Sequence, residues 1–140
     1  MDRALNYIAL ARKAGLVELG EEPAGAAARA LKAHLIVVAS DASDHTWRRA
    51  RSYVAGTDQQ CIRLPFTKEE MGFVVGRTSL AIAAITDAAL ALSLVKALGD
   101  PEKYKDAMAY LTQRTKKVRQ RQEEAKAHQR NLRHGGKKKD

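Results

Sequence analysis

The stretch from Gly15 to Ser43 constrains the fold more than any other part of this chain of 140 residues. It contains a short apolar segment, a glycine turn, an alanine-rich helical segment and the apolar run Leu35–Ala39, joined by short connections. Pro23 suits the first helical position, where its missing N–H costs nothing. A continuous run of β-branched and apolar residues is typical of a central strand that is covered on both faces. The stretch therefore predicts a strand–helix–strand unit within an α/β protein.

Further elements are expected on both sides of this unit. Residues 3–14 have apolar side chains at helical spacing, and Gly15 is a fitting helix stop. A short first strand is expected over 16–19. The elements expected after the unit are a helix to about Val54 capped by Asp41 or Ser43, a strand over 61–64, a helix from Thr67 to Gly76 with a Thr67–Glu70 capping box, a strand over 80–85, and a helix from Asp87 to Leu98.

Strands that alternate with helices predict a three-layer α/β/α sandwich around a mixed sheet of about four strands. The chain is long enough for one compact domain, which we expect over residues 1–98. Because aromatic residues make up only 5% of the sequence, Ala, Leu, Val and Ile must fill the core. The pattern does not determine the order of the strands.

The residues after a break at Gly99-Asp100-Pro101 differ in composition from those before it. Residues 1–98 hold 12 Lys or Arg and 10 Asp or Glu, whereas residues 99–140 hold 13 and 6. Most of the net charge of +9 therefore belongs to the second part. We expect residues 99–140 to form a basic extension, helical to about Arg130 and disordered over 135–139.

A row of residues at a spacing of seven runs along this extension. Its companion row is apolar only at its first position and polar afterwards, so only the first turns are expected to dock on the domain. The first row is Tyr104, Leu111, Val118, Ala125 and Leu132, and the companion row is Met108, Thr115, Gln122 and Gln129.

The basic extension favours nucleic acid as a partner. Between Arg114 and Lys139 lie 11 basic residues and only 2 acidic ones. Each neutralised phosphate releases counterions, so such a helix binds RNA with a steep salt dependence. The alternative is a solvated tail that only aids solubility. The phosphate contacts expected here are Arg114, Lys116, Lys117, Arg119 and Arg121.

Several other classes of protein are disfavoured. A single cysteine, Cys61, makes no internal disulfide, and the N-terminus lacks the pattern of a signal peptide. We therefore expect a cytoplasmic monomer. Nothing approaches the roughly 20 apolar residues that span a bilayer, so no membrane partner is expected.

No catalytic, metal or cofactor site is expected either. The four histidines show no metal-ligand spacing, and there is no phosphate-binding glycine loop. Helix capping explains Ser40, Asp41 and Ser43 without a hydrolase site. We accordingly expect no enzymatic activity.

Three segments, Ala11–Gly20, Leu35–Ser43 (LIVVASDAS) and Met71–Asp87 (MGFVVGRTSLAIAAITD), agree in order and spacing with a known family. In these segments the chain resembles the L-seven-Ae and L-thirty-e type ribosomal proteins in their small bacterial form. The resemblance covers residues 3–98. It implies binding to structured RNA of the kink-turn type, as part of rRNA or the ribosome.

The resemblance also implies where RNA binds. The family uses the glycine turn, the start of the helix that follows it, and an apolar second loop. Helix N-termini offer free N–H groups to phosphates or base edges, and apolar loop residues cover an extruded base. Arg29 and Lys32 are expected to flank that side as phosphate contacts. The remaining residues expected to bind RNA in the domain are Gly20, Glu21, Glu22, Met71, Gly72, Val74, Val75, Gly76 and Arg77.

Four positions depart from the family's usual residues. Glu22, Pro23 and Ala26 stand where Asn, Glu and Lys are common, and Leu16 replaces a frequent Lys. These departures motivate an alternative function, a protein–protein interaction module that keeps the fold but has lost kink-turn binding. Glu21 and Glu22 are also explained as partners of the helix dipole.

Trp47 lies beside Arg48, Arg49 and Arg51. The group has two interpretations that the sequence leaves open. It forms either a patch for stacking and phosphate contacts or a half-buried tryptophan beside solvated arginines.

Overall fold

A computed structural model describes the backbone of residues 2–138 and the surroundings of side chains as far as Leu132. The elements are α1 (Arg3–Ala14), β1 (Val17–Leu19), α2 (Glu21–Arg29), β2 (Leu35–Val38), α3 (Asp44–Val54), β3 (Gln60–Arg63), α4 (Lys68–Phe73), β4 (Ile82–Ile85), α5 (Ala88–Ala97) and α6 (Lys105–Lys138).

The four strands form one mixed sheet in the order β1-β4-β2-β3. β2 and β3 are parallel, and β4 runs antiparallel to both of its neighbours. Val38 lies opposite Ile82 and Arg63, and we call this end of the strands the Val38 end. Leu35 lies opposite Ile85 and Gln60 at the other end of the strands, which we call the Leu35 end.

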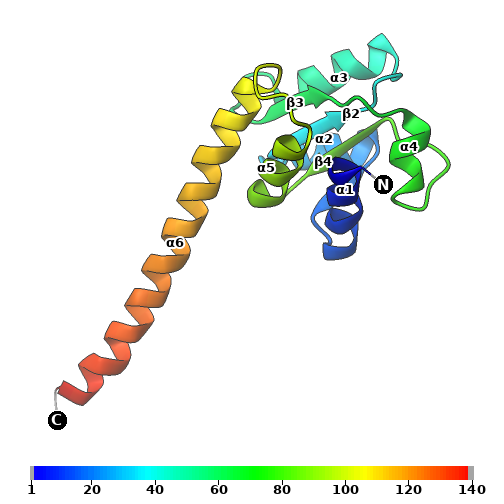
Figure 1. Ribbon diagram of the computed structural model, residues 1–140. Helices are drawn as coiled ribbons and strands as arrows, with labels where there is room; N and C mark the ends of the chain where they lie inside the picture. The colour runs from blue at the N-terminus through cyan, green and yellow to red at the C-terminus, as the bar shows by residue number, and fades with distance from the viewer. Residues whose placement is uncertain (1, 139–140) are drawn as a thin grey trace.

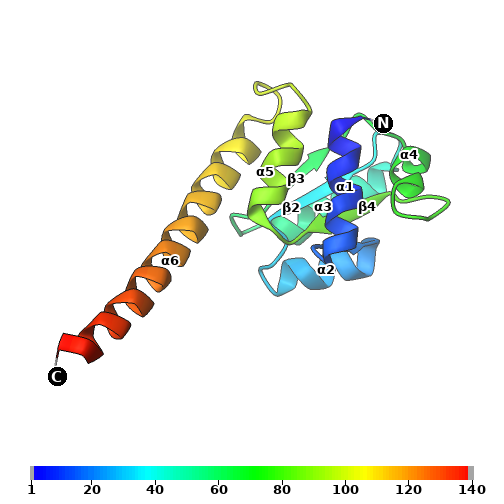
Figure 2. The same cartoon turned by 60° about the horizontal axis from the view of Figure 1, so that its bottom comes forward.

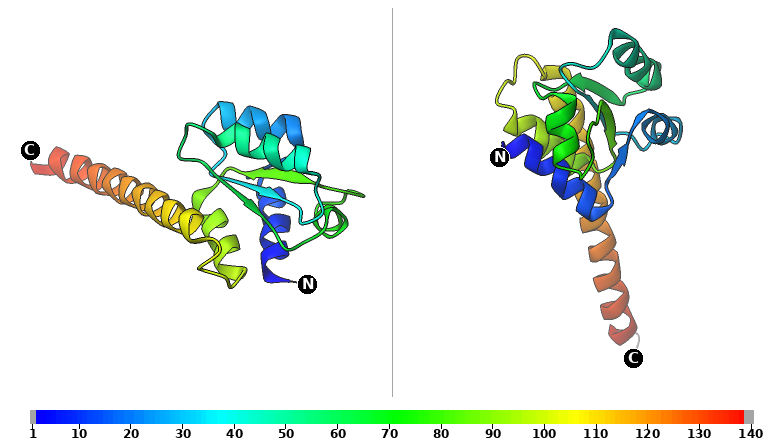
Figure 3. Two further views of the ribbon diagram at one scale, coloured as in Figure 1. Left: turned by 90° about the horizontal axis from the view of Figure 1, so that it is seen from above. Right: turned by 90° about the vertical axis from the view of Figure 1, so that its right-hand side faces the viewer.

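Helices cover both faces of the sheet. α2 and α3 pack together on one face, while α1, α5 and the start of α6 lie on the other (Figure 3). Every residue of the two central strands, β2 and β4, is buried, because each strand has a helix layer above and below it. The predicted three-layer α/β/α sandwich with a mixed sheet of four strands is confirmed.

Local sequence signals fix most helix ends. Gly15 closes α1 in the left-handed region, with φ 72°. The side chains of Ser43 and Asp87 cap α3 and α5. Thr67 and Glu70 form the predicted capping box at the start of α4.

Two local predictions were wrong in detail, and one of the two residues offered as the cap of α3 is excluded. Gly20 is the N-cap of α2, so Pro23 is the third helical residue rather than the first. α4 ends at Phe73, because the chain then turns back and Gly76 lies beyond the helix. Asp41 does not cap α3, since its Oδ1 accepts a hydrogen bond from the Lys68 N–H at 2.8 Å.

The long helix α6 belongs partly to the core. The hydrophobic core includes Tyr104, just before α6, and Ala107 and Leu111 within the helix. The core therefore continues beyond the expected domain boundary at Gly99. Val118 and Leu132, further along, are 39% and 63% exposed. The prediction that only the first turns dock is confirmed.

Two contacts fix the path of α6 along the domain. The Tyr104 hydroxyl donates to the carbonyl oxygen of Arg63 at the Val38 end, at 3.2 Å. The Tyr110 hydroxyl lies 3.3 Å from Nδ1 of His34, next to the Leu35 end. After Thr115, the last buried residue described on the helix, α6 leaves the domain as a single rod (Figures 1 and 2).

The helix is longer than expected. It runs to Lys138 instead of ending near Arg130, so residues 135–138 are helical rather than disordered. Gly135 and Gly136 lie within this helix, although glycine is a poor helix former. Lys139, part of the segment expected to be disordered, lies outside the described residues. Between residues 2 and 138, no helix is long and apolar enough to cross a membrane.

Candidate nucleic-acid interface

The Gly20 turn forms the first part of the candidate interface. Gly20 has φ 97° and ψ 169°, a conformation that is essentially restricted to glycine. Its N–H donates to the Ile82 carbonyl at 2.9 Å, which fixes the turn at the Val38 end. No side chain caps α2, and Pro23 has no N–H, so Glu21 and Glu22 carry the donors of the first turn.

The loop after α4 forms the second part. The Arg77 N–H donates to the carbonyl of Gly72 at 2.9 Å, so the loop folds back over the end of α4. A Cβ atom on Gly72 would lie 2.8 Å from both the Arg77 carbonyl oxygen and the Ser79 nitrogen. Only glycine therefore allows this close approach of the two backbone segments.

Arg77 joins the two parts. A Cβ atom on Gly20 would lie 3.9 Å from Nη1 of Arg77, so this guanidinium group stands beside the glycine turn. The two segments that the family resemblance singled out thus meet at one end of the sheet, although Gly20 and Gly72 are 52 positions apart in the sequence.

Burial divides the predicted residues of the second loop. Met71 and Val75 are 0% and 1% exposed, and Gly72 is also buried. Their assignment as a surface that covers an extruded base is therefore wrong, because these residues pack in the core. Val74 is half-buried, while Gly76 and Arg77 are exposed.

Phe73 was missed by sequence reasoning. Its side chain is 77% exposed, whereas the next most exposed large apolar side chains of the described residues, Leu31 and Leu132, are 63% exposed. The apolar pattern did not single it out, because Met71, Val74 and Val75 around it are apolar too and α4 ends at Phe73. The docking of α4 decides that Met71 is buried and Phe73 is exposed.

Charges at the Val38 end are mixed. Hollows on either side of Phe73 are lined by Lys68 and Arg77, but also by Asp41, Glu69 and Glu70. With Glu21 and Glu22 in the first turn of α2, this end offers few unpaired positive charges to a polyanion. Most of the positive charge of the chain therefore lies elsewhere, in the part that follows Gly99.

The groove between α2 and α3 holds a small ionic group. Nε of Arg49 lies 3.9 Å from the Glu21 carboxylate and donates to the Tyr53 hydroxyl at 3.4 Å. The Tyr53 hydrogen bond, followed by the Glu21 charge, raises the pKa of Arg49. Arg29 lines the same groove, which also reaches Glu22 and Pro23 at the start of α2.

Trp47 belongs to the packing of α3. It is half-buried against the core, and the Arg63 guanidinium lies 5.0 Å from its ring centroid. This geometry supports the interpretation of a half-buried tryptophan that stacks on an arginine. Nearby, burial raises the pKa of the Cys61 thiol to about 12, so the thiol is protonated and unreactive at neutral pH.

The remaining predicted cations lie at or beyond the Leu35 end. Lys32 precedes His34 by two residues, so it does not flank the Gly20 turn as expected. Arg114 lies near His34, and burial followed by the Arg114 charge lowers the pKa of this histidine. The predicted contacts that stand exposed on α6 beyond this point are Lys116, Lys117, Arg119 and Arg121.

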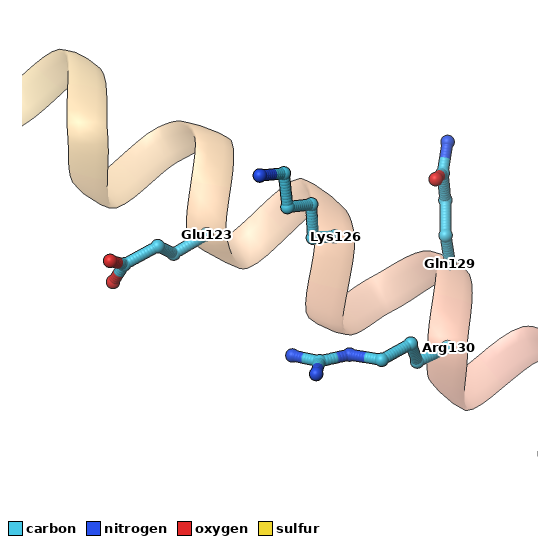
Figure 4. A pocket seen from close by; sticks show the side chains of 4 residues that line it. All are labelled: Glu123, Lys126, Gln129 and Arg130. Atoms are coloured by element: carbon cyan, nitrogen blue, oxygen red, sulfur yellow. The ribbon is translucent and has the colours of Figure 1, made fainter.

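Further along α6, charged side chains project from an isolated helix. Figure 4 shows the side chains of Glu123, Lys126, Gln129 and Arg130, which project from this helix. The shallow hollow between them is bounded by a single helix and is open to solvent. In the part of the chain that the structure describes, no group of three or more His, Cys, Asp or Glu side chains is placed to hold a metal ion.

Comparison with known proteins supports the fold and leaves the family open. No protein-family model and no curated protein matches the chain. Among solved structures, a Bacillus halodurans protein of unknown function is 19% identical, with a TM-score of 0.65, over 71% of this chain and 99% of that one. A Giardia lamblia protein described as a 15.5kD RNA binding protein is 17% identical, with a TM-score of 0.56, over 69% of this chain and 82% of that one.

The chain shares its fold with an RNA-binding protein. At these identities the likeness concerns the fold alone. The covered 71% corresponds to about 99 residues, which is the length of the domain ahead of the break at Gly99.

Proposed function

We propose that this chain is a cytoplasmic RNA-binding protein without enzymatic activity that is associated with rRNA or the ribosome. The Val38 end docks on structured RNA of the kink-turn type, and α6 supplies electrostatic affinity. The position of Arg77 beside Gly20 carries the proposal, because it joins two separate segments into one surface.

Each part of this surface has a chemical use. The N–H groups of Glu21 and Glu22 are donors for a phosphate or a base edge at the start of α2. The guanidinium of Arg77 matches the geometry of a phosphate group. The exposed ring of Phe73 offers a stacking surface for an unpaired base. Glu22 accepts a hydrogen bond from a base amino group.

The test compares kinked RNA with a straight duplex of the same composition. We expect tighter binding to the kinked RNA, and an Arg77→Gln variant should bind it roughly tenfold more weakly because one charge-assisted hydrogen bond is lost. Arg12→Gln, an exposed arginine in the last turn of α1, which leads into β1 at the Leu35 end, is the matched control. Equal affinity of wild type and Arg77→Gln for both RNAs would contradict the proposal.

The contribution of α6 is best measured in the full-length chain. Truncation after Leu98 would remove the buried Tyr104 and Leu111 and so damage the core itself. Substituting Lys116, Lys117, Arg119 and Arg121 by Gln removes only exposed charges. The slope of log K against log salt should fall by up to about 3 to 4, because each phosphate contact contributes about 0.9.

A second candidate function is a protein-interaction module. The 77% exposed Phe73 beside Glu69 and Glu70 favours it, since this acidic rim repels phosphates but attracts a basic protein. Capture of partners from cells with and without ribonuclease separates the two functions. Partners that survive ribonuclease treatment favour the interaction module, and partners that are lost favour RNA binding.

A further inference from the structure

We propose that the chain carries two separate RNA-binding surfaces at opposite ends of the sheet, so that one molecule holds two RNA segments together. This inference rests on the proposed function. It adds that α6 binds a different stretch of RNA from the one at the Gly20 turn.

The path of α6 separates the two surfaces. The Gly20 turn is fixed at the Val38 end by the bond to Ile82. α6 begins near the same end, where Tyr104 contacts Arg63, and reaches the Leu35 end at Tyr110. Beyond its docked turns, α6 projects away from the domain (Figures 1 and 2).

The separation is large compared with a small RNA motif. A strand of four residues spans about 13 Å, and the 20 residues from Tyr110 to Arg130 extend about 30 Å. Added end to end, these two lengths separate the cations near Arg130 from the Gly20 turn by up to about 40 Å. A few kinked base pairs seated on the turn do not reach them.

The root of α6 holds the helix in this direction. Leu111 is fully buried and Thr115 is 5% exposed, and they follow the hydrogen-bonded Tyr104 and Tyr110 along the helix. With contacts spread over three turns, the distal helix is not free to fold back over the Val38 end. The two surfaces consequently face different surroundings.

The distal helix suits the phosphodiester backbone of an RNA duplex. The helical period places Arg119, Lys126 and Arg130 on one side and Lys117 and Arg121 on another. Cations on two sides allow a helix that lies along a groove to face phosphates of both strands. Because these side chains are exposed and carry no fixed partners in the described structure, such binding is largely independent of sequence.

The test measures whether one protein molecule brings two RNAs together. Full-length protein is mixed with a donor-labelled kink-turn RNA and an acceptor-labelled straight RNA duplex. We expect energy transfer when protein and the two RNAs are present at similar concentrations. In a large excess of protein the transfer should disappear, because each RNA is then bound to a different protein molecule. Unlabelled duplex should abolish the transfer without releasing the kink-turn RNA.

Two variants assign the surfaces. The Lys116→Gln, Lys117→Gln, Arg119→Gln, Arg121→Gln variant should lose transfer but still prefer kinked to straight RNA. Arg77→Gln should reduce transfer by about the same tenfold factor as its binding to kinked RNA. The matched control on the same helix is Glu123→Gln with Glu124→Gln, which leaves all the cations in place and should keep the transfer.

The outcomes are distinguishable. If the chain binds either RNA alone but the two displace each other, the two-surface proposal is overturned while the proposed function stands. Transfer that survives Arg77→Gln unchanged also overturns it, because both RNAs would then lie on α6. Absence of binding to either RNA overturns the proposed function itself.

Discussion

Gly72 shows how one missing side chain positions a binding loop. An alanine here would place its Cβ 2.8 Å from two backbone atoms of Arg77 and Ser79, so the loop must move. We expect Gly72→Ala to lower the free energy of unfolding by about 1–3 kcal/mol, as overpacking does, and to displace Arg77 from Gly20. Urea unfolding and RNA affinity measure the two effects.

The control for this substitution is Glu69→Ala, an exposed position of the same helix whose unfolding should change by less than about 0.5 kcal/mol. Wild-type unfolding and RNA affinity in Gly72→Ala would show that the loop tolerates a Cβ atom.

His34 makes stability depend on pH. Its pKa is lowered in the folded chain by burial and then by Arg114, while the unfolded chain keeps the ordinary value of 6.5. Between these two values the unfolded state binds more protons, so the free energy of unfolding falls as pH drops below 6.5. Above 6.5 both states are neutral at this position and its contribution is constant.

Urea midpoints at neutral and mildly acidic pH check this expectation. His34→Gln should show a smaller decline than wild type, whereas His45→Gln, on the exposed side of α3, should decline as wild type does. An undiminished decline in His34→Gln would assign the pH dependence to other groups.

At the scale of single residues, the sequence predicted what local chemistry decides. Thr67 and Glu70 form their capping box within one turn, so their pattern was sufficient. Whether Met71 or Phe73 faces solvent depends on how α4 docks against the sheet. The sequence pattern of apolar residues alone did not distinguish them.

At the scale of elements, α6 is one helix with two environments. Leu111 is 0% exposed in the core and Leu132 is 63% exposed on the same helix. Leu111→Ala should lower the free energy of unfolding by about 2–5 kcal/mol, because it leaves a cavity. Leu132→Ala should change it by less than about 0.5 kcal/mol.

Chemical denaturation of the two variants compares the same chemical change in both places. Similar losses at both positions would mean that the distal helix packs against something in solution. Helix spacing had predicted this division from the row of sevenfold-spaced residues. It did not predict that the domain's core includes the start of α6, because the turn at Gly99 only reverses the chain and brings Tyr104 back to Arg63.

At the scale of the whole molecule, the layers were predictable but their connections were not. Alternation of helices and strands gave the three-layer sandwich, since each strand needs cover on both faces. The order β1-β4-β2-β3 depends on contacts between residues distant in sequence. Lys32 was therefore assigned beside the Gly20 turn, although the strand directions place it at the opposite end.

The uneven charge distribution also acquires a spatial meaning. The sequence divided it into a balanced first part and a basic second part. In the structure the two parts are also separated in space, because α6 extends away from α4 and from the acidic residues near Phe73. If the chain binds RNA as proposed, we expect the RNA to meet the distal helix before the domain.

Because α6 is anchored only at its start, we expect its amide hydrogen-exchange rates to increase along the helix. Backbone amides near Leu111 are protected by the core and exchange their hydrogens only when that core opens. Amides from about Gln120 to Leu132 belong to a solvated helix, and isolated helices of this length are marginal in water. We therefore expect slow amide exchange near Leu111 and fast exchange beyond Gln120 within one uninterrupted helix. A polyanion bound to the distal turns would slow exchange only there, and so the exchange rates would locate its binding site.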